Sequence, residues 1–128
     1  MQIGAAAAQS GVSAKMIRYY EEIGLVPRSA RLAQGYREYD DQGVHRLRFV
    51  ARARDLGFSI KEIAELLRLY SDRRRSSADV KRIALRHVAE LDTKIRALRQ
   101  LKRTIQQLAD RCHGNERPEC PILDDLAR

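Results

Sequence analysis

Apolar residues recur at helical spacing along most of this chain, and a few breaks divide the pattern into segments. The first segment, residues 3–10, is rich in alanine and stops at Gly11. Ser13 can then cap a second helix that runs to about Ile23, where Gly24 supplies another stop. The pattern therefore predicts two helices joined by a tight turn, a helix-turn-helix.

The second of these helices has two distinct sides. Met16, Tyr20 and Ile23 follow one another at steps of four and three residues, which predicts the side that packs. The other side is polar and basic and carries Lys15, Arg18, Tyr19 and Glu22. A helix that packs on one side and offers cations on the other fits the element that enters the major groove of DNA.

The helical period is lost between Val26 and Tyr39. Pro27, Gly35 and the residues around them predict two short strands joined by a turn that contains the glycine. A hairpin after a helix-turn-helix can lie along the DNA backbone or in the minor groove as a wing. The side chains expected to contact DNA are Lys15, Arg18 and Tyr19 on the helix and Arg31, Tyr36 and Arg37 on the wing.

Two further helices are predicted after the hairpin. Asp40 and Asp41 can start one that carries an apolar stripe to about Leu56. Residues 59–62 match a capping box, in which a serine oxygen and a glutamate carboxylate each bind an otherwise unpaired amide. Apolar residues continue from there at helical spacing to Tyr70, so a fourth helix is expected.

A long helix is predicted next, because neither Gly nor Pro interrupts the chain between Ser77 and Gly114. About 35 helical residues would extend about 52 Å. Apart from Lys102, the positions at heptad spacing are apolar: Ala84, Val88, Leu91, Ile95, Leu98, Ile105 and Ala109. The rest of the chain is too short to cover this seam, so the pattern predicts a homodimer through a coiled coil, with either direction of pairing.

Composition narrows the class of protein. The 128 residues suffice for one ordinary domain or two small ones and exclude a large multidomain enzyme. Aromatic residues make up only 5%, which favours helices packed on aliphatic faces and a mostly α fold. No apolar run is long enough to span a membrane, so a cytoplasmic protein is expected. Phosphate-binding loops and hydrolase motifs are missing from the sequence, and no enzyme is expected.

The charge balance indicates a polyanionic partner. Lys and Arg number 25 against 17 Asp and Glu, and the formal net charge of +8 favours nucleic acid. Most of the excess falls on residues 71–111, where a solvated flank of the coiled coil and direct contact with DNA would both account for it. A structural dimer that compacts DNA without sequence preference is an alternative to a regulator.

Cys112 and Cys120 are the two cysteines of the chain and lie close together near its C-terminus. With Gly114 and Pro118 in the short loop between them, the sulfurs can face each other across one ion. Soft thiolates favour Cu(I), Ag(I) and Au(I), and two sulfurs suit a monovalent ion that accepts linear coordination, whereas Zn(II) takes about four ligands. Pro121 can begin a short helix whose N-terminal dipole would favour a thiolate at Cys120.

A redox switch is the alternative interpretation of the same pair. The short separation permits a disulfide between Cys112 and Cys120, and nearby basic residues would assist its formation. The dithiol pattern supports both a metal site and a disulfide.

Four segments resemble the N-terminal signature of the mercury-resistance regulator (MerR) family. They are residues 3–6, 13–25, 35–39 and 56–63, which read IGAA, SAKMIRYYEEIGL, GYREY and LGFSIKEI, and the likeness extends over the whole chain. The resemblance implies a dimeric winged-helix transcription factor whose heads are held by an antiparallel pair of long helices. Such regulators act with RNA polymerase on promoters with an overlong spacer, which they bend and untwist at a cost of about 1–6 kcal/mol.

The C-terminal loop narrows the resemblance to one branch of the family. The two cysteines and the sequence CPIL that begins at Cys120 look like the copper efflux regulators. Ser77 matches the position where members that sense divalent metals carry a further cysteine, and the resemblance places it beside the metal without binding it. The chain lacks the Cys/His-rich tail of the copper regulators. His113 and Pro118 lie where loop residues could tune selectivity, so Cu(I), Ag(I) and Au(I) all stay candidates.

The sequence thus predicts three parts: a winged helix-turn-helix DNA-binding domain (1–70), a linker and dimerisation helix (71–111), and a metal-binding loop with a short C-terminal helix (112–128). The expected function is that of a homodimeric regulator that binds double-stranded promoter DNA. It activates transcription by distorting the DNA when the thiolates of Cys112 and Cys120 bind Cu(I), or Ag(I) or Au(I). The alternative is a thiol-redox regulator that switches by a Cys112–Cys120 disulfide.

Overall fold

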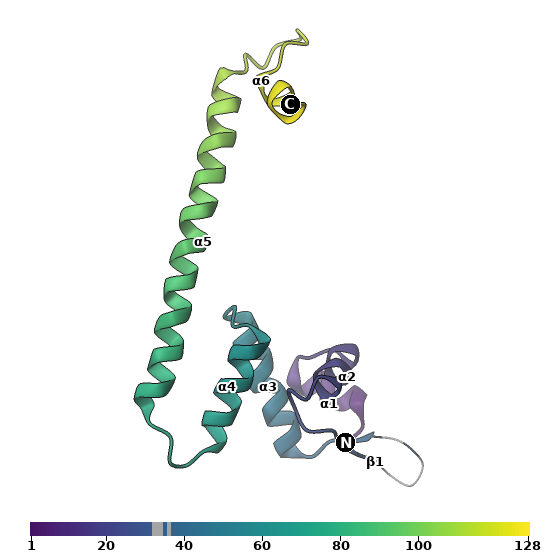
Figure 1. The fold of residues 1–128 in the computed structure, drawn as a ribbon. Helices are drawn as coiled ribbons and strands as arrows, with labels where there is room; N and C mark the ends of the chain where they lie inside the picture. The colour runs from purple at the N-terminus through teal and green to yellow at the C-terminus, as the bar shows by residue number, and fades with distance from the viewer. Residues whose placement is uncertain (32–34, 36) are drawn as a thin grey trace. The chain divides into compact units, whose positions relative to one another are not determined.

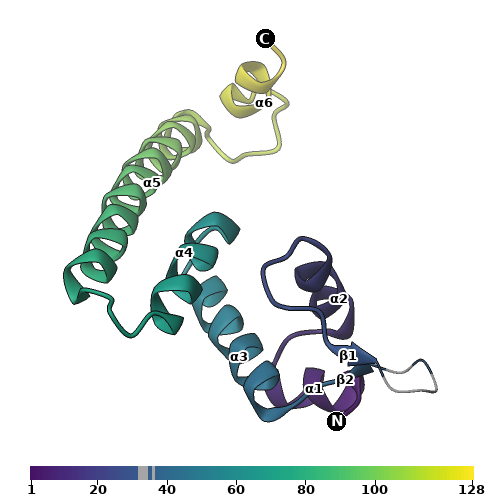
Figure 2. The same ribbon diagram turned by 60° about the horizontal axis from the view of Figure 1, so that its bottom comes forward.

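The computed structural model describes residues 1–31, 35 and 37–128, and this part of the chain is mostly helical, as predicted. The helices belong to two compact units, Met1–Ile83 and Ala84–Arg128. Figures 1 and 2 show the ribbon from two directions. No helix in the described residues is both long enough and apolar enough to cross a lipid bilayer.

The first unit begins with the predicted helix-turn-helix. Helix α1 (Ile3–Ser10) and helix α2 (Ala14–Glu22) are joined at Gly11, whose φ of 77° is one that glycine adopts without strain. The hydroxyl of Ser13 caps α2 by accepting a hydrogen bond from the N–H of Met16 at 3.2 Å. Both helices therefore start and stop where local signals in the sequence place the boundaries.

The predicted hairpin follows α2. Strand β1 (Ala30–Arg31) pairs antiparallel with strand β2 (Arg37–Glu38), with Ala30 opposite Glu38 and Arg31 opposite Arg37. Each strand is only two residues long. Tyr36, a predicted DNA contact, lies outside the described residues, and of Arg31 only the backbone is described. In Figure 2 the N-terminus lies beside the two strands, and the N–H of Tyr39 donates to the carbonyl of Met1 at 2.7 Å.

Two capped helices complete residues 1–71 of this unit, which we call the head. Helix α3 (Asp41–Asp55) is capped by Asp40, whose carboxylate accepts from the N–H of Gly43 at 2.7 Å. Helix α4 (Ile60–Ser71) has the predicted capping box. In it, the Glu62 N–H donates to the Ser59 hydroxyl at 3.1 Å and the Ser59 N–H donates to the Glu62 carboxylate at 2.9 Å.

One hydrophobic core holds the head together. Helix α1 packs against α2 and α3, and α3 packs against α4. The buried side chains of this core come from every helix of the head and from the segments that join the helices and strands: Ala6, Val12, Ile17, Tyr20, Val26, Tyr39, Val44, Leu47, Val50, Ala53 and Ile63. Each large aliphatic side chain buried in this way contributes about 1.5–3 kcal/mol, so the core fixes how α2 is presented.

The packing side predicted for α2 was partly wrong. Ile17 is fully buried and Tyr20 is buried beside it, whereas Met16 is half-buried and Ile23 is 42% exposed. The helix ends at Glu22, so Ile23 is the C-terminal cap residue and no longer follows the helical period. The packed side is therefore centred on Ile17 and Tyr20.

The long helix α5 (Ser77–Arg111) has 35 residues, as expected, and the hydroxyl of Ser76 accepts from the N–H of Ala78 at its start. A loop follows, and helix α6 (Pro121–Leu126) begins with the proline, as predicted. Figure 1 shows the loop that joins the last turns of α5 to α6. Leu108, in those turns, is buried at 7% exposure.

Candidate DNA-binding face and two-cysteine site

The basic side of α2 is open to solvent. Lys15, Arg18 and Tyr19 are all exposed, while Ile17 and Tyr20 are buried beneath them. The ring of Tyr19 lies 5.9 Å from the ring of Tyr20, centroid to centroid, so a buried neighbour supports the exposed ring. The helix thus offers two cations and a phenol on one side, a set that can bind phosphates and base edges.

Arg37 is the wing candidate whose side chain the structure describes. Its side chain is 27% exposed, and Nη1 lies 3.5 Å from the Glu21 carboxylate on α2. The guanidinium has five N–H donors in a planar fork, so an ion pair through one nitrogen leaves others available. Arg37 can therefore pair with α2 and still reach a phosphate.

Glu21 is a residue that sequence reasoning missed. It is buried at the end of α2, where its carboxylate accepts hydrogen bonds from Ser29, Arg37 and Tyr39. Burial, and then the hydrogen bond to Glu21, raise the pKa of Tyr39, so this phenol stays a neutral donor. The signal in the sequence was the position of Glu21 four residues after Ile17 and next to Tyr20, on the packed side.

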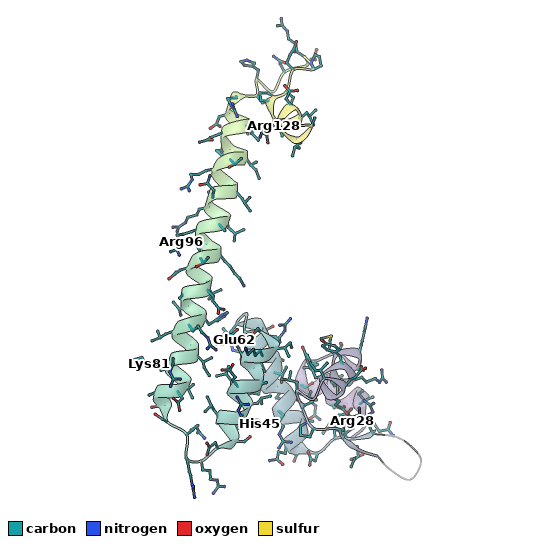
Figure 3. All side chains as sticks on the ribbon, viewed as in Figure 1. Arg28, His45, Glu62, Lys81, Arg96 and Arg128 are labelled. Atoms are coloured by element: carbon teal, nitrogen blue, oxygen red, sulfur yellow. The ribbon has the colours of Figure 1, made fainter. Side chains whose placement is uncertain are left out.

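The loop after α5 brings the two cysteines together. Cys112 directly follows α5, and its N–H donates to the carbonyl of Ala109 at 3.1 Å. Cys120 is the N-terminal cap residue of α6. Both are free thiols and half-buried, and the thiol of Cys112 is one of the groups that lower the pKa of Cys120. Figure 3 shows the side chains of this loop as sticks above the end of α5.

Backbone amides at the start of α6 favour the thiolate form of Cys120. The N–H of Leu123 is the largest influence and lowers the pKa of this thiol, and the N–H of Ile122 and the thiol of Cys112 lower it further. Partial burial and the charge of Asp124 act in the opposite direction but do not cancel them. Because the thiolate is both the nucleophile and the metal ligand, Cys120 is prepared for either chemistry.

The other predicted residues of this site lie apart from the sulfurs or are exposed. His113 and Pro118 are exposed in the loop, and Ser77 is exposed at the start of α5. Within the part of the chain that the structure describes, no third Cys, His or carboxylate forms a compact ligand cluster with the sulfur pair. The candidate donors that the described loop offers are therefore the sulfurs of Cys112 and Cys120.

The fold and its exposed basic helix define a winged helix-turn-helix protein of the DNA-binding class. The family model of MerR helix-turn-helix regulatory proteins matches residues 1–70, and the model of the MerR DNA-binding region matches residues 44–108. The chain belongs to the MerR family.

The relatives whose names are known are also transcription regulators. The chain is 56% identical over 128 residues to the HTH-type transcriptional regulator HmrR of Sinorhizobium medicae, covering 100% of this chain and 87% of that protein. It is 56% identical over 127 residues to heavy metal-dependent transcription regulator 2 of Rhizobium meliloti (99% and 86% covered). It is 39% identical over 127 residues to the regulator CueR of Salmonella typhimurium (99% and 92% covered).

A solved structure supports the fold over nearly the full length. The transcription regulator PbrR691 of Ralstonia metallidurans, crystallised in complex with lead(II), superposes with a TM-score of 0.83 at 32% identity. The alignment covers 98% of each chain. The mostly helical fold and the family predicted from the sequence are therefore confirmed.

Proposed function

We propose that this chain is a metal-responsive transcription regulator that binds double-stranded promoter DNA as a homodimer. The observation that carries the proposal is the pairing of two half-buried free thiols, one with a lowered pKa, directly after the long helix. Residues 1–70 bind DNA, residues 71–111 link and dimerise the chains, and residues 112–128 bind the metal. The names of the relatives, one of them called heavy metal-dependent, support the same class.

The metal in this proposal is Cu(I), with Ag(I) and Au(I) as chemically equivalent choices. Two thiolates from Cys112 and Cys120 form a closed set of soft donors, which d¹⁰ monovalent ions accept in linear geometry. A bis-thiolate with such an ion carries a net charge of −1, and the amides that lower the pKa of Cys120 would stabilise it. The similarity to CueR supports this branch.

The homodimer forms through the apolar seam of α5. Val88, Ile95, Leu98 and Ile105 are between 44% and 64% exposed in the single chain, a large apolar area for a helix with so many charged neighbours. Ser77 begins α5 and Cys112 directly follows its last residue. In an antiparallel pair of these helices, a serine beside the sulfur pair would come from the partner. That Ser77 would shape the site without binding the ion.

Activation follows from a difference in affinity between two states of the dimer. Lys15, Arg18 and Tyr19 on α2 and Arg31, Tyr36 and Arg37 on the wing contact each half of the promoter. Metal binding favours the dimer that fits bent and untwisted DNA, and the contacts offset a deformation energy of about 1–6 kcal/mol. RNA polymerase then meets its recognition elements at a workable spacing.

A thiol-redox regulator is the second candidate, and the presence of two free thiols, one of which lowers the pKa of the other, favours it. The thiolate of Cys120 would attack an oxidised partner such as a low-molecular-weight disulfide, and Cys112 would then displace that partner. Overall, two thiols would lose two protons and two electrons to the oxidant and form one disulfide.

Transcription in a purified system tests the proposal. The template is a promoter fragment that the wild-type protein selects from genomic DNA, and the variants are Cys112→Ser and Cys120→Ser, with Glu116→Gln in the same loop as the control. Under anaerobic conditions Cu(I) should activate the wild type and Glu116→Gln but neither cysteine variant, and all four should bind the fragment. Activation by an oxidant without metal would favour the redox candidate, and activation of the cysteine variants by Cu(I) would refute the sulfur site.

A further inference from the structure

Glu21 places a charged group inside the head at the point where the recognition helix meets the wing. It lies in the last turn of α2, and its side chain is 3% exposed. A carboxylate removed from water to this degree is costly unless hydrogen-bond donors replace the lost water. The donors around Glu21 therefore show which segments of the chain its carboxylate connects.

Both carboxylate oxygens of Glu21 are occupied. Oε2 accepts from the backbone N–H of Ser29 at 3.1 Å and from the hydroxyl of the same residue at 3.3 Å. Oε1 accepts from the hydroxyl of Tyr39 at 2.5 Å and lies 3.5 Å from Nη1 of Arg37. Hydrogen bonds to an ionised acceptor are stronger than neutral ones, so this cluster is a firm connection.

The donors come from both sides of the hairpin. Ser29 immediately precedes β1, Arg37 belongs to β2, and Tyr39 immediately follows β2. Strands of two residues each form few ladder hydrogen bonds, and an isolated two-stranded hairpin is marginally stable in water. One carboxylate on α2 thus holds the wing by both of its ends.

We propose that Glu21 is a positioning residue for DNA binding, which holds the wing, and Arg37 in particular, in register with Lys15 and Arg18 on α2. The inference rests on the proposed DNA-binding function. Arg37 gives Nη1 to Glu21 and keeps a 27% exposed side chain, so its remaining donors can meet a phosphate from a fixed place. Glu21 itself is too deeply buried to touch DNA.

The charge of Glu21 allows the proposal to be tested against a control variant with the same change in charge. Replacing a glutamate near the DNA-binding face by glutamine removes a negative charge, which by electrostatics alone strengthens binding to DNA. Glu22→Gln makes that change at the exposed neighbour of Glu21 and is the matched control. Glu21→Gln makes the same change in charge but turns an amide NH₂ toward groups that are themselves donors. The changes in DNA affinity that the two variants cause should therefore have opposite signs.

The measurement is binding to a duplex that the wild-type protein selects from a random-sequence pool, followed by fluorescence anisotropy at several salt concentrations. Circular dichroism establishes that each variant is folded at the assay temperature. We expect Glu22→Gln to bind as tightly as the wild type or more tightly. Glu21→Gln should bind about 5- to 30-fold more weakly. The slope of log affinity against log salt should become shallower by the amount that corresponds to about one lost phosphate contact per head.

Tyr39→Phe removes a single donor and keeps the inference testable if Glu21→Gln does not fold. It should weaken binding in the same direction and lower the same slope, whereas Tyr70→Phe, remote from the cluster, should do neither. A folded Glu21→Gln that matches Glu22→Gln in affinity and slope would overturn the inference. So would an unchanged Tyr39→Phe, should Glu21→Gln not fold. Failure of the wild type to select any duplex would instead refute the proposed DNA-binding function.

Discussion

Tyr39 and Cys120 have pKa values displaced in opposite directions by the groups around them. Tyr39 is buried beside a carboxylate, and both effects penalise the phenolate. Two backbone amides at the start of α6 and a neighbouring thiol favour the thiolate of Cys120 and lower its pKa. The same physical rule therefore keeps one residue neutral as a donor and prepares the other as a ligand.

The raised pKa of Tyr39 predicts a loss of stability at alkaline pH. In the unfolded chain the phenol ionises near 10.0, and in the folded chain it ionises at a higher pH. The contribution of Tyr39 to the unfolding free energy is thus complete below the unfolded value of 10.0 and is lost as the pH rises through the folded pKa. The difference in unfolding free energy between wild type and Tyr39→Phe, from urea denaturation, should shrink above pH 10.0. A difference that grows with pH there would contradict the cause given.

The lowered pKa of Cys120 predicts an order of alkylation. In the metal-free, reduced protein, iodoacetamide should label Cys120 before Cys112 at a pH below the usual range of thiols, because the reaction requires the thiolate. Peptide mass spectrometry reports the order. In urea the preference should vanish, because the amides at the start of α6 no longer lie where they lower the pKa of Cys120. Equal labelling in the folded protein would refute the lowered pKa.

At the scale of elements, local signals in the sequence were sufficient for most helix boundaries. Ser13, Asp40, Ser59 and Pro121 each stand at a helix start because the side chain or ring satisfies a local need of the first turn. These interactions span three residues or fewer, so a sequence shows them directly. The packed side of the nine-residue α2 was harder, because two and a half turns contain few positions with which to fix a face.

The burial of Glu21 was beyond local reasoning for a different reason. A carboxylate is buried when donors elsewhere in the chain satisfy it, and those on Ser29 and Tyr39 are 8 and 18 residues away. The pairing of Cys112 with Cys120 was foreseeable, because a loop of seven residues keeps the sulfurs near each other. The lowering of the Cys120 pKa by the amides of Ile122 and Leu123 depends on how α6 begins, and the proline after Cys120 predicted that start.

The capping box of α4 predicts a measurable cost of its removal. Ser59→Ala should lower the unfolding free energy by about 1 kcal/mol, because the N–H of Glu62 loses its acceptor. The control is Ser71→Ala at the other end of α4, where the hydroxyl donates to a carbonyl already inside the helix. That change should stay within about 0.5 kcal/mol. Urea denaturation measures the unfolding free energy of both variants. Equal losses in Ser59→Ala and Ser71→Ala would contradict the stabilising role of the cap.

At the scale of the whole molecule, the apolar seam of α5 and the net charge of +8 require partners. We propose a second copy of the chain as the partner of the seam and DNA as the partner of the cations. A regulator that responds to metal must connect the two, because an ion can shift only an equilibrium between states that it binds with different affinity. In the proposed dimer, those states are two arrangements of the two heads, and metal binding favours one of them.

Disruption of the seam should dissociate the dimer. Leu98→Lys places a charge at a core position of the heptad, and the loss of two buried leucines per dimer should weaken association at least about a hundredfold. Gln100→Lys adds the same charge on the outer side of the helix and should leave the dimer intact. Analytical ultracentrifugation separates the two outcomes. A dimeric Leu98→Lys at the concentrations where the wild type is dimeric would exclude this seam.

X-ray absorption spectroscopy of the Cu(I)-loaded, reduced protein tests the sulfur site most directly, because it reports the identity and number of atoms bound to the metal. The account predicts two sulfur neighbours per copper in the wild type, no shell of nitrogen or oxygen donors, and loss of this signature in Cys112→Ser. A spectrum dominated by nitrogen or oxygen donors, or one that Cys112→Ser leaves unchanged, would contradict the account.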